Sequence, residues 1–393
     1  MKTILILGAG LWQIPYLRKA KEMGLHVCAT DWSDNPEGKK YADVFESISV
    51  RDKEKTLTFA IENKIDAVFT NSDVAVPTVA YVAECLNIPC YTQQQANIAT
   101  NKFQMRNFIK AIGLQTPEYF LCATLEELRE KYALLGKKCI IKPIDNCGSR
   151  GVYIINTQEQ LLNLAHETFE NSFSGKILIE EFMVGKESSV EVLVNEGKPT
   201  ILGWCKKIKS PEPYRFDIQL DYFPDFSEKE HEDVCNLVDI LVNGLKYQNG
   251  IMHIEFMWTT SGIKIIEFAL RGCGSNVITH LMPILRGFDI MEFLLKKAIG
   301  ETINVNLTKN LFGTLKFIIP SEGIVKSLSG IDTILQMDGL LDFYTDLQAG
   351  YKIEAIKNGR SRPGHFIVFG ESREEVFSKI DFVENNLQIE YND

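Results

Sequence analysis

The sequence predicts a protein of mixed α/β and α+β class, with an N-terminal doubly wound parallel sheet, a β-rich central region and a small C-terminal unit that closes over them. Near the N-terminus, short apolar runs alternate with helical stretches, which is the pattern of a parallel sheet covered by helices. Beyond about residue 139, extended segments follow one another with glycine turns between them. After about residue 310, short strands punctuated by glycines lead to a helix near 372–386.

The N-terminal unit is expected to span residues 1–96. Its first strand, residues 2–7, is apolar and ends at the turn Gly8-Ala9-Gly10. The elements expected after this turn are helices at 12–23, 53–63 and 74–86 and strands at 26–31 and 67–70.

The central unit is expected over residues 97–309 and the closing unit over 310–393. Within the central unit we expect a lid subdomain over about 114–186. Its opening helix is predicted at 101–112. The strands predicted after it lie at 139–143, 152–156, 176–181 and 188–195, followed by a hairpin over 251–271.

The bulk composition excludes several classes of protein. Of the 393 residues, 45% are hydrophobic and 24% charged, as in ordinary globular proteins. A net charge of −10 argues against a nucleic acid or an anionic membrane as the main partner. No apolar run reaches the roughly 18–20 residues of a membrane span. Nine cysteines without a CxxC pair predict neither a disulfide framework nor a zinc site and are typical of the cytoplasm.

The predicted hairpin carries one acidic residue on each strand. Because side chains alternate between the faces of a strand, one face is expected to pack on a core through Ile254, Phe256, Trp258, Ile266, Phe268 and Leu270. Glu255 and Glu267 lie on the opposite face, equidistant from a turn centred on Ser261. A symmetric hairpin makes these two residues cross-strand neighbours.

Two carboxylates that face each other repel, so a fold that keeps them there usually supplies a cation. Mg²⁺ prefers oxygen ligands and is commonly held by one or two carboxylates together with phosphates. The alternative is a solvated polar face on which Arg271 pairs with Glu267. The residues of the hairpin alone leave both interpretations open.

A glycine-containing loop follows the strand that ends near Lys142. Glycines in the segment 146–151 let the backbone approach a ligand, while Ser149 and Arg150 add a hydroxyl and a cation. The GxxxxGK[ST] order of a P-loop is absent, and a plain hairpin turn is the alternative to a phosphate flap. Farther along, the extended segment 179–183 has backbone groups that can read an adenine edge.

The order of these elements resembles the ATP-grasp superfamily, in the branch of biotin carboxylase, carbamoyl-phosphate synthase and the purine ligases. The resemblance covers nearly the whole chain, with the N-terminal unit similar to the pre-ATP-grasp domain and the tail similar to the closing domain. It rests on the ordered set Lys102, Lys142, Gly148–Gly151, Glu180–Glu187, Glu255 and Glu267-x-x-x-Arg271.

The resemblance implies a role for each of these residues. Glu255 and Glu267 would bind Mg²⁺, with Mn²⁺ as an alternative, and Arg271 and Lys142 would be the catalytic cations. The ATP-binding residues would be Lys102 and Lys142 at the phosphates, Ser149, Arg150 and Gly151 in the lid, Glu180, Glu181, Phe182 and Met183 at adenine, and Glu187 at ribose.

One residue departs from the family pattern. The family usually has Glu-x-Asn-x-Arg, and Ala269 occupies the Asn position here. This substitution removes one metal ligand, so a second Mg²⁺ would need a ligand from elsewhere, for which Asn276 is a candidate.

The chemistry implied by the resemblance is ADP-forming ligation. A substrate carboxylate attacks the γ-phosphate of ATP to give an acyl-phosphate, and an amine or other nucleophile then displaces phosphate. The alternatives on the same fold are a carboxylase that acts through carboxyphosphate and a non-catalytic ATP-binding protein. Small-molecule carboxylates and amines are the expected partners, and a homodimer is compatible with the sequence.

A dinucleotide-binding oxidoreductase is the alternative from a different class. Gly8-x-Gly10 follows a strand, and Asp31 ends the second strand, as in dinucleotide-binding folds. Gln13 stands where the third glycine belongs, so the fingerprint is incomplete. In the ATP-grasp interpretation this end of the sheet, with Trp12 and residues 71–73, would face the substrate.

Overall fold

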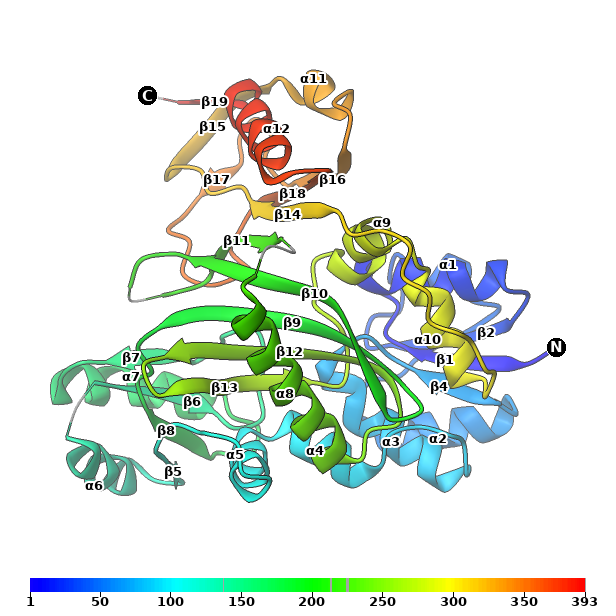
Figure 1. The fold of residues 1–393 in the computed structure, drawn as a ribbon, viewed down its shortest axis with the longest axis horizontal. Coiled ribbons are helices and arrows are strands. Elements are labelled where there is room, and N and C mark those ends of the chain that lie inside the picture. The colour runs from blue at the N-terminus through cyan, green and yellow to red at the C-terminus, as the bar shows by residue number, and fades with distance from the viewer. Residues whose placement is uncertain (137, 213, 224–225, 393) are drawn as a thin grey trace.

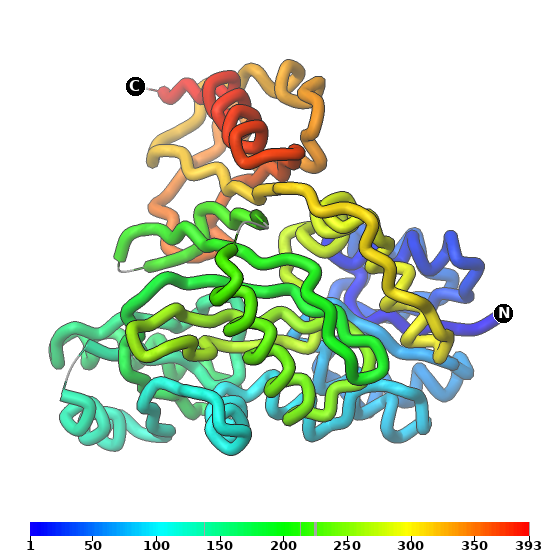
Figure 2. Tube along the Cα trace, viewed as in Figure 1, coloured from blue at the N-terminus to red at the C-terminus, as the bar shows by residue number. Residues whose placement is uncertain are grey.

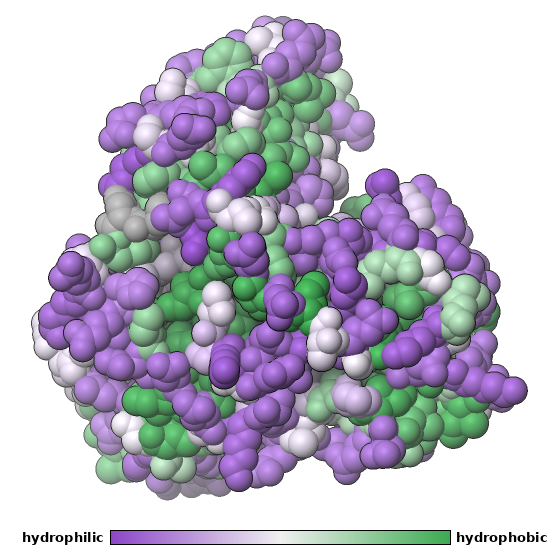
Figure 3. Space-filling model, turned by 45° about the vertical axis from the view of Figure 1, so that its right-hand side comes forward, coloured by the Kyte–Doolittle hydropathy of each residue, from purple (hydrophilic) through white to green (hydrophobic). Residues whose placement is uncertain are grey.

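The computed structural model describes residues 1–136, 138–212, 214–223 and 226–392. Figures 1 and 2 show a blue N-terminal lobe, a central body and a red C-terminal lobe, with the two chain ends emerging from different lobes. Hydrophilic side chains cover much of the face in Figure 3, and a notch separates the C-terminal lobe from the N-terminal lobe. None of the described helices is long and apolar enough to cross a lipid bilayer.

The N-terminal lobe is a parallel sheet with the strand order β3-β2-β1-β4. Alternate residues of β1 enter two different core clusters, so both faces of the sheet are covered, as predicted. The predicted elements agree within two residues, and β3, which is short and not fully buried, was not predicted. The elements are β1 (Thr3–Leu7), α1 (Ile14–Glu22), β2 (His26–Asp31), β3 (Val44–Ser47), α2 (Lys53–Glu62), β4 (Ala67–Phe69), α3 (Val76–Cys85) and α4 (Gln93–Thr100).

A second, antiparallel sheet with the order β5-β8-β6-β7 follows the helix α5 (Lys102–Ala111). Residues of α6 and α7 pack with it in one apolar cluster. It lies within the range predicted for the lid. Its elements are β5 (Tyr119–Cys122), α6 (Leu125–Leu135), β6 (Cys139–Pro143), β7 (Tyr153–Ile155), α7 (Gln158–Glu170) and β8 (Ile177–Glu181).

The main sheet has eight antiparallel strands in the order β13-β12-β9-β10-β11-β14-β18-β16. Strands from the predicted closing unit therefore continue the central sheet across residue 310. The strands are β9 (Lys186–Asn195), β10 (Lys198–Lys209), β11 (Asp217–Tyr222), β12 (Asn249–Thr259), β13 (Gly262–Ala269), β14 (Phe312–Phe317), β16 (Leu340–Thr345) and β18 (Gly364–Gly370).

Helix α8 (Glu228–Leu245) lies across one face of this sheet (Figure 1). Its buried apolar stripe packs with Val190, Val192 and Ile254. Because strand side chains alternate, Glu191 and Glu255 point to the opposite face. That face, away from α8, carries the polar residues of the candidate site.

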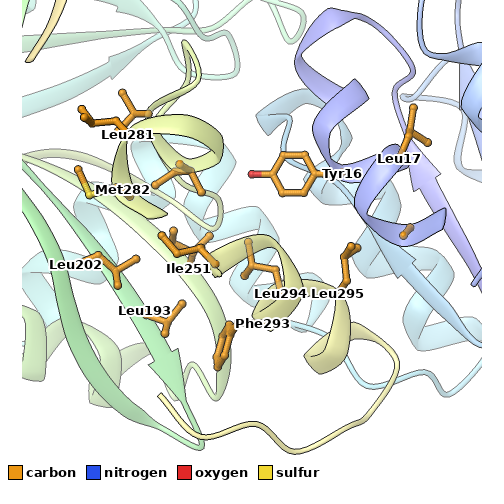
Figure 4. Close-up of a cluster of buried hydrophobic side chains, with 14 of the residues drawn as sticks. Tyr16, Leu17, Leu193, Leu202, Ile251, Leu281, Met282, Phe293, Leu294 and Leu295 are labelled. Carbon is orange, nitrogen blue, oxygen red and sulfur yellow. The ribbon is translucent and has the colours of Figure 1, made fainter. Parts of the chain in front are cut away.

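Two further helices connect the central body to the N-terminal lobe. Residues of α9 (Met282–Arg286) and α10 (Ile290–Ala298) share an apolar cluster with residues of α1 and β1. In Figure 4 the ring of Tyr16 extends from α1 toward Ile251 of β12. The C-terminal lobe is completed by β15 (Gly323–Ser329), α11 (Ile331–Leu335), β17 (Lys352–Ile353), α12 (Arg373–Asn386) and β19 (Gln388–Tyr391).

Candidate active site

Glu255 of β12 and Glu267 of β13 are direct register partners, as the sequence analysis predicts. The hairpin reaches this register by a different route from the one expected. Its strands meet at Thr259 and Gly262, and an irregularity after Glu255 shifts the register by one residue. Ile265 is consequently the buried core residue, and the prediction that Ile266 faces the core was wrong.

The carboxylate of Glu255 is held by two cationic side chains. Lys207 Nζ lies 2.6 Å and His253 Nε2 lies 3.0 Å from the same oxygen, Oε1. Burial alone would raise the pKa of Glu255, but the charges of Lys207, His253 and Lys209 outweigh it and hold the pKa well below the usual value. Glu255 is therefore an anion within a cationic surrounding.

Glu267 is paired with the lysine predicted to contact phosphate. Lys102 Nζ lies 3.4 Å from Glu267 Oε2 and donates to the carbonyl oxygen of Asn146 at 2.8 Å. Among the described residues, no hydrogen bond reaches Oε2 of Glu255 or Oε1 of Glu267. Each carboxylate thus keeps one oxygen for a cation, and this donor set suits Mg²⁺.

A row of lysines on β10 completes the charged face. Lys207 and Lys209 are two residues apart and therefore point the same way. Glu187 forms ion pairs with Lys209 at 2.6 Å and with Lys207 at 3.4 Å, while Asp217 lies 2.9 Å from Lys209. The structure thus places Glu187, the predicted ribose contact, in an ion-pair network.

The sequence analysis did not single out Lys207 or Lys209. Lysines on a predicted strand usually indicate a solvated face, yet the Lys207 side chain is only 2% exposed. Their burial could have been predicted from their spacing. Cys205, Lys207 and Lys209 are alternate residues of one strand and so share a face, and Cys205 is buried.

Lys142, the penultimate residue of β6, lies in a buried cluster with Glu180 of β8 and Arg106 of α5. Lys142 Nζ lies 2.6 Å from Glu180, and Arg106 binds both oxygens of Glu180 at 2.6 and 3.1 Å. Burial lowers the pKa of Lys142 to about 8 although Glu180 opposes the shift. The Glu180 side chain is committed to these cations, so any contact with adenine is left to its backbone.

The residues after Glu180 form the connection between β8 and β9. The Glu181 amide donates to the carbonyl of Glu118, and the Phe182 amide to that of Lys138. Lys138 also lies over the Phe182 ring at 4.2 Å. Met183 follows with its side chain half-buried. Their predicted contact with adenine stays a prediction.

The predicted lid loop has left-handed backbone at three positions, Gly148 (φ +70°), Ser149 (φ +58°) and Gly151 (φ +68°). Arg150 folds back on the loop, where its Nε donates to the carbonyl of Cys147 at 3.1 Å. Gly148 and Ser149 line the large cavity described next. The loop therefore borders that cavity, and its contact with phosphate stays a prediction.

A cavity of about 1070 Å³ lies between the three lobes. Arg271, at the end of the β13 strand, lines it, and its guanidinium pairs with Asp73 of the N-terminal lobe. Trp12 and Gln13 come from the same lobe, and His365 from the C-terminal lobe. This arrangement brings all three units to one site.

Ala269 faces His253 directly across the hairpin. The Asn276 side chain donates to Asp342 at 2.7 Å and its oxygen accepts from Thr279. The Asn276 side chain is therefore bound to the C-terminal lobe. It does not replace the ligand that Ala269 lacks for a second Mg²⁺.

The N-terminal turn does not have the form expected of a dinucleotide site. Asp31 accepts from the amide of Ala9 at 2.8 Å and from that of Ser33 at 3.0 Å, so it fastens the loop itself. A Cβ at Gly8 would lie 3.1 Å from the side chain of Gln13, which fills the space beside the turn. The oxidoreductase alternative is therefore not supported.

Comparisons with known proteins show which domains this chain resembles. A family profile described as an ATP-grasp domain matches residues 135–280, and one described as L-amino acid ligase C-terminal domain 2 matches residues 316–392. The solved L-amino acid ligase from Bacillus licheniformis superposes with a TM-score of 0.87 at 20% identity, covering 100% of this chain and 99% of that one. The biotin carboxylase domain of the Hydrogenobacter thermophilus 2-oxoglutarate carboxylase, solved with MgADP and bicarbonate, superposes with a TM-score of 0.75 at 17% identity, covering 99% and 90%.

Sequence comparison also finds similar proteins. A formate-dependent phosphoribosylglycinamide formyltransferase of Bacteroides thetaiotaomicron is 25% identical over 77% of this chain and 78% of its own length. An uncharacterised protein of Sinorhizobium fredii, y4rH, is 24% identical over 75% of this chain, and the match spans 62% of its length. Residues 135–280 are thus an ATP-grasp domain, and the similar proteins include a phosphoribosylamine–glycine ligase of Methanococcus vannielii and the L-amino acid ligase named above. The C-terminal lobe of this chain is of the kind found in L-amino acid ligases.

Proposed function

We propose that this protein is a Mg²⁺- and ATP-dependent ligase that joins the carboxylate of one amino acid to the amine of another. The observation that carries the proposal is the acidic pair Glu255 and Glu267, which has two oxygens without a hydrogen bond among the described residues and lies beside Lys102 and Lys207. The amino-acid substrate class is supported by the match of the C-terminal lobe to L-amino acid ligases.

In the proposed reaction, a substrate carboxylate oxygen attacks the γ-phosphorus of ATP and ADP leaves. The amine then attacks the acyl carbon, phosphate leaves, and a proton is released. Mg²⁺ held by the acidic pair would supply charge neutralisation at the phosphates. Lys102 and Lys142 would hold phosphate oxygens, and Arg271 would stabilise the negative charge of the acyl-phosphate.

Arg271 is prepared for this role by its neighbours. Its guanidinium pairs with Asp73 and donates to the carbonyl of Gly272 at 2.7 Å, which fixes the group at the cavity wall. A cation fixed before the reaction stabilises developing charge without reorganising. The same contact ties the catalytic cation to the lobe expected to face the substrate.

The test is an ADP-release screen over pairs of amino acids with Mg²⁺, comparing wild type with Glu267→Gln. We expect the substitution to lower turnover roughly 100-fold or more, because a neutral amide is a poor metal ligand. Glu232→Gln, on the exposed side of α8, is the matched control and should retain full activity. Unchanged turnover and Mg²⁺ requirement in Glu267→Gln would refute the metal assignment.

A carboxylase acting through carboxyphosphate is the second candidate, and it is favoured by the similarity to a biotin carboxylase domain solved with bicarbonate. The same screen separates the two reactions. ADP release that depends on bicarbonate and not on an amino-acid carboxylate would support the carboxylase and contradict the ligase.

A further inference from the structure

A histidine and an aspartate of the C-terminal lobe lie together at the wall of the large cavity. His365 is on β18 and Asp342 is on β16, where Asp342 pairs with Ile367, so the two side chains are diagonal neighbours on one face of the sheet. Phe366 and Val368, on the other face, pack in the core of the lobe. His365 and Asp342 therefore face away from that core, and both line the cavity.

The two side chains form a hydrogen-bonded pair. Nε2 of His365 lies 3.0 Å from Oδ2 of Asp342, and the same oxygen accepts from the Asn276 amide at 2.7 Å. Burial would raise the pKa of Asp342, but the hydrogen bonds from His365 and Asn276 lower it, so the carboxylate is an anion. An anionic partner accepts the Nε2 proton, which leaves the lone pair of a neutral imidazole on Nδ1.

The Nδ1 atom of His365 is open to the cavity side of the ring. It has no hydrogen-bond partner among the described residues, and it is not among the polar atoms that are closed off from solvent. The side chain is 6% exposed and lines the large cavity. The rings of Trp12, Phe317 and Tyr344 lie around the imidazole, with centroids 5.9–6.2 Å away, and fix its orientation. A base that is oriented in this way can take a proton from a ligand in the cavity.

The pair is connected to Arg271, the cation proposed to hold the acyl-phosphate, from two sides. Asn276, which binds Asp342, lies in the segment that follows Arg271, and both line the cavity. Trp12, beside His365, comes from the N-terminal lobe, as does the aspartate that pairs with Arg271. His365 and Arg271 therefore border one space, in which an amine would meet the acyl-phosphate.

We propose that His365 is the catalytic base that takes a proton from the attacking amine and that Asp342 positions it, an inference that rests on the proposed ligase activity. An amino acid enters as an ammonium ion, which has no lone pair for attack. Nδ1 of His365 takes one proton, the nitrogen forms a bond to the acyl carbon, and the bond from that carbon to the phosphate oxygen breaks. The second proton leaves with the phosphate, and His365 releases its own proton to water.

Other titratable groups of the cavity wall are less suited to this role. Asp73 and Asp217 are paired with cations, Asp346 accepts from a tyrosine, and Glu22 is exposed to solvent. His280 also lines the cavity, but its Nδ1 contacts the Thr279 hydroxyl at 2.8 Å, and among the described residues no carboxylate binds its ring.

The test compares two nucleophiles for the same acyl-phosphate near neutral pH. Hydroxylamine is largely uncharged there and attacks without a base to give a hydroxamate, whereas an amino acid must first lose a proton. His365→Gln should lower dipeptide formation roughly 100-fold and leave hydroxamate formation within about twofold of wild type. Asp342→Asn should lower dipeptide formation at least about tenfold and also spare the hydroxamate, because the imidazole loses the anion that orients it.

His26→Gln is the matched control, because His26 also contacts an aspartate, Asp43 at 3.5 Å, but lies outside the large cavity. Both of its rates should equal those of wild type. If His365→Gln lowers both rates equally or neither, or if His280→Gln separates the two rates instead, the assignment is overturned. If His365→Gln does not fold, the two rates of Asp342→Asn decide in the same way.

The same assay tells a failure of this inference from a failure of the proposed function. Wild type that forms both products while no variant separates them would refute the role of His365 alone. Wild type that forms neither product from any amino acid would refute the ligase proposal and this inference with it.

Discussion

Glu255 stands at the end of a buried chain of polar contacts. Glu191 is fully buried, accepts from the amide of Cys273 at 2.9 Å and contacts His253 Nδ1 at 2.6 Å. The other ring nitrogen of His253 contacts Glu255 at 3.0 Å. Burial would lower the pKa of His253, but the two carboxylates raise it to about 9. The imidazole therefore orients the carboxylate that we propose as a metal ligand.

Removing this support should weaken the metal site. We expect His253→Ala to raise the Mg²⁺ concentration for half-maximal ADP release about 10- to 100-fold, the usual cost of losing a residue that orients a metal ligand. His166→Ala, on the exposed surface of α7, is the control. If His253→Ala folds and its Mg²⁺ requirement is unchanged, the contacts from Glu191 through His253 do not position Glu255.

The lowered pKa of Lys142 predicts a pH dependence. The side chain is protonated below about pH 8 and neutral above it, so its attraction for phosphate is lost as pH rises. For the free enzyme, kcat/KM for ATP should fall about tenfold per pH unit above 8.

The control is Lys142→Arg, in which the guanidinium stays charged, so the fall should move to higher pH. A wild-type profile that stays flat to pH 9.5 would contradict the contact between Lys142 and phosphate.

The sequence predicted the acidic pair because parity along a strand is independent of what surrounds it. It did not predict that Arg106, on a helix, would be almost fully buried against Glu180. Nor did it predict Lys207 and Lys209. Their burial depends on carboxylates supplied by other strands, and such pairings across a sheet leave no mark in the local sequence.

Among the elements, the loop after β6 is under the most defined backbone constraint. A Cβ at Gly151 would lie 2.9 Å from Asn171 Cβ, whereas at Gly148, with nearly the same positive φ, it would meet nothing within 4 Å. Gly148→Ala should therefore lose about 1–2 kcal/mol of local stability through φ alone.

Gly151→Ala should lose more and should also raise KM for ATP, because the loop must shift from Asn171. Urea unfolding and ATP kinetics of the two variants measure the difference. Equal effects would show that the contact with Asn171 is unimportant.

The elements themselves were predicted well where apolar runs were bounded by glycine or proline, as at β1 and β6. The hairpin shows the limit of this reasoning. The pairing of Glu255 with Glu267 was predicted correctly, but the register changes by one residue after Glu255, so Ile265 rather than Ile266 faces the core. β12 also pairs with β9, and the sequence of the hairpin alone does not predict this second pairing or the irregularity.

At the scale of the whole molecule, an aromatic contact joins the N-terminal lobe to the loop between α7 and β8. The Arg51 guanidinium lies 3.8 Å from the centre of the Phe173 ring, next to Asp145 and the loop that follows β6. Such contacts contribute modestly, about 0.5–1 kcal/mol at exposed sites. The contact between Arg51 and Phe173 therefore holds the two parts together only weakly.

Arg51→Ala should accelerate amide hydrogen exchange in residues 171–176 while leaving the melting temperature nearly unchanged. Arg129→Ala, on the exposed side of α6, serves as the control. Equal exchange in the two variants would argue that the lid is held by other contacts.

The eight-stranded sheet limits how this protein can be divided. β11 is hydrogen-bonded to β14 from Gln219 to Tyr222, so a fragment ending at residue 309 would expose a row of unpaired backbone groups. Such strands recruit other chains, and the fragment should aggregate. The C-terminal lobe therefore cannot be separated from the central body without breaking this sheet. In a chimera of two relatives, all eight strands would have to come from the same parent, with the junctions in loops outside the sheet.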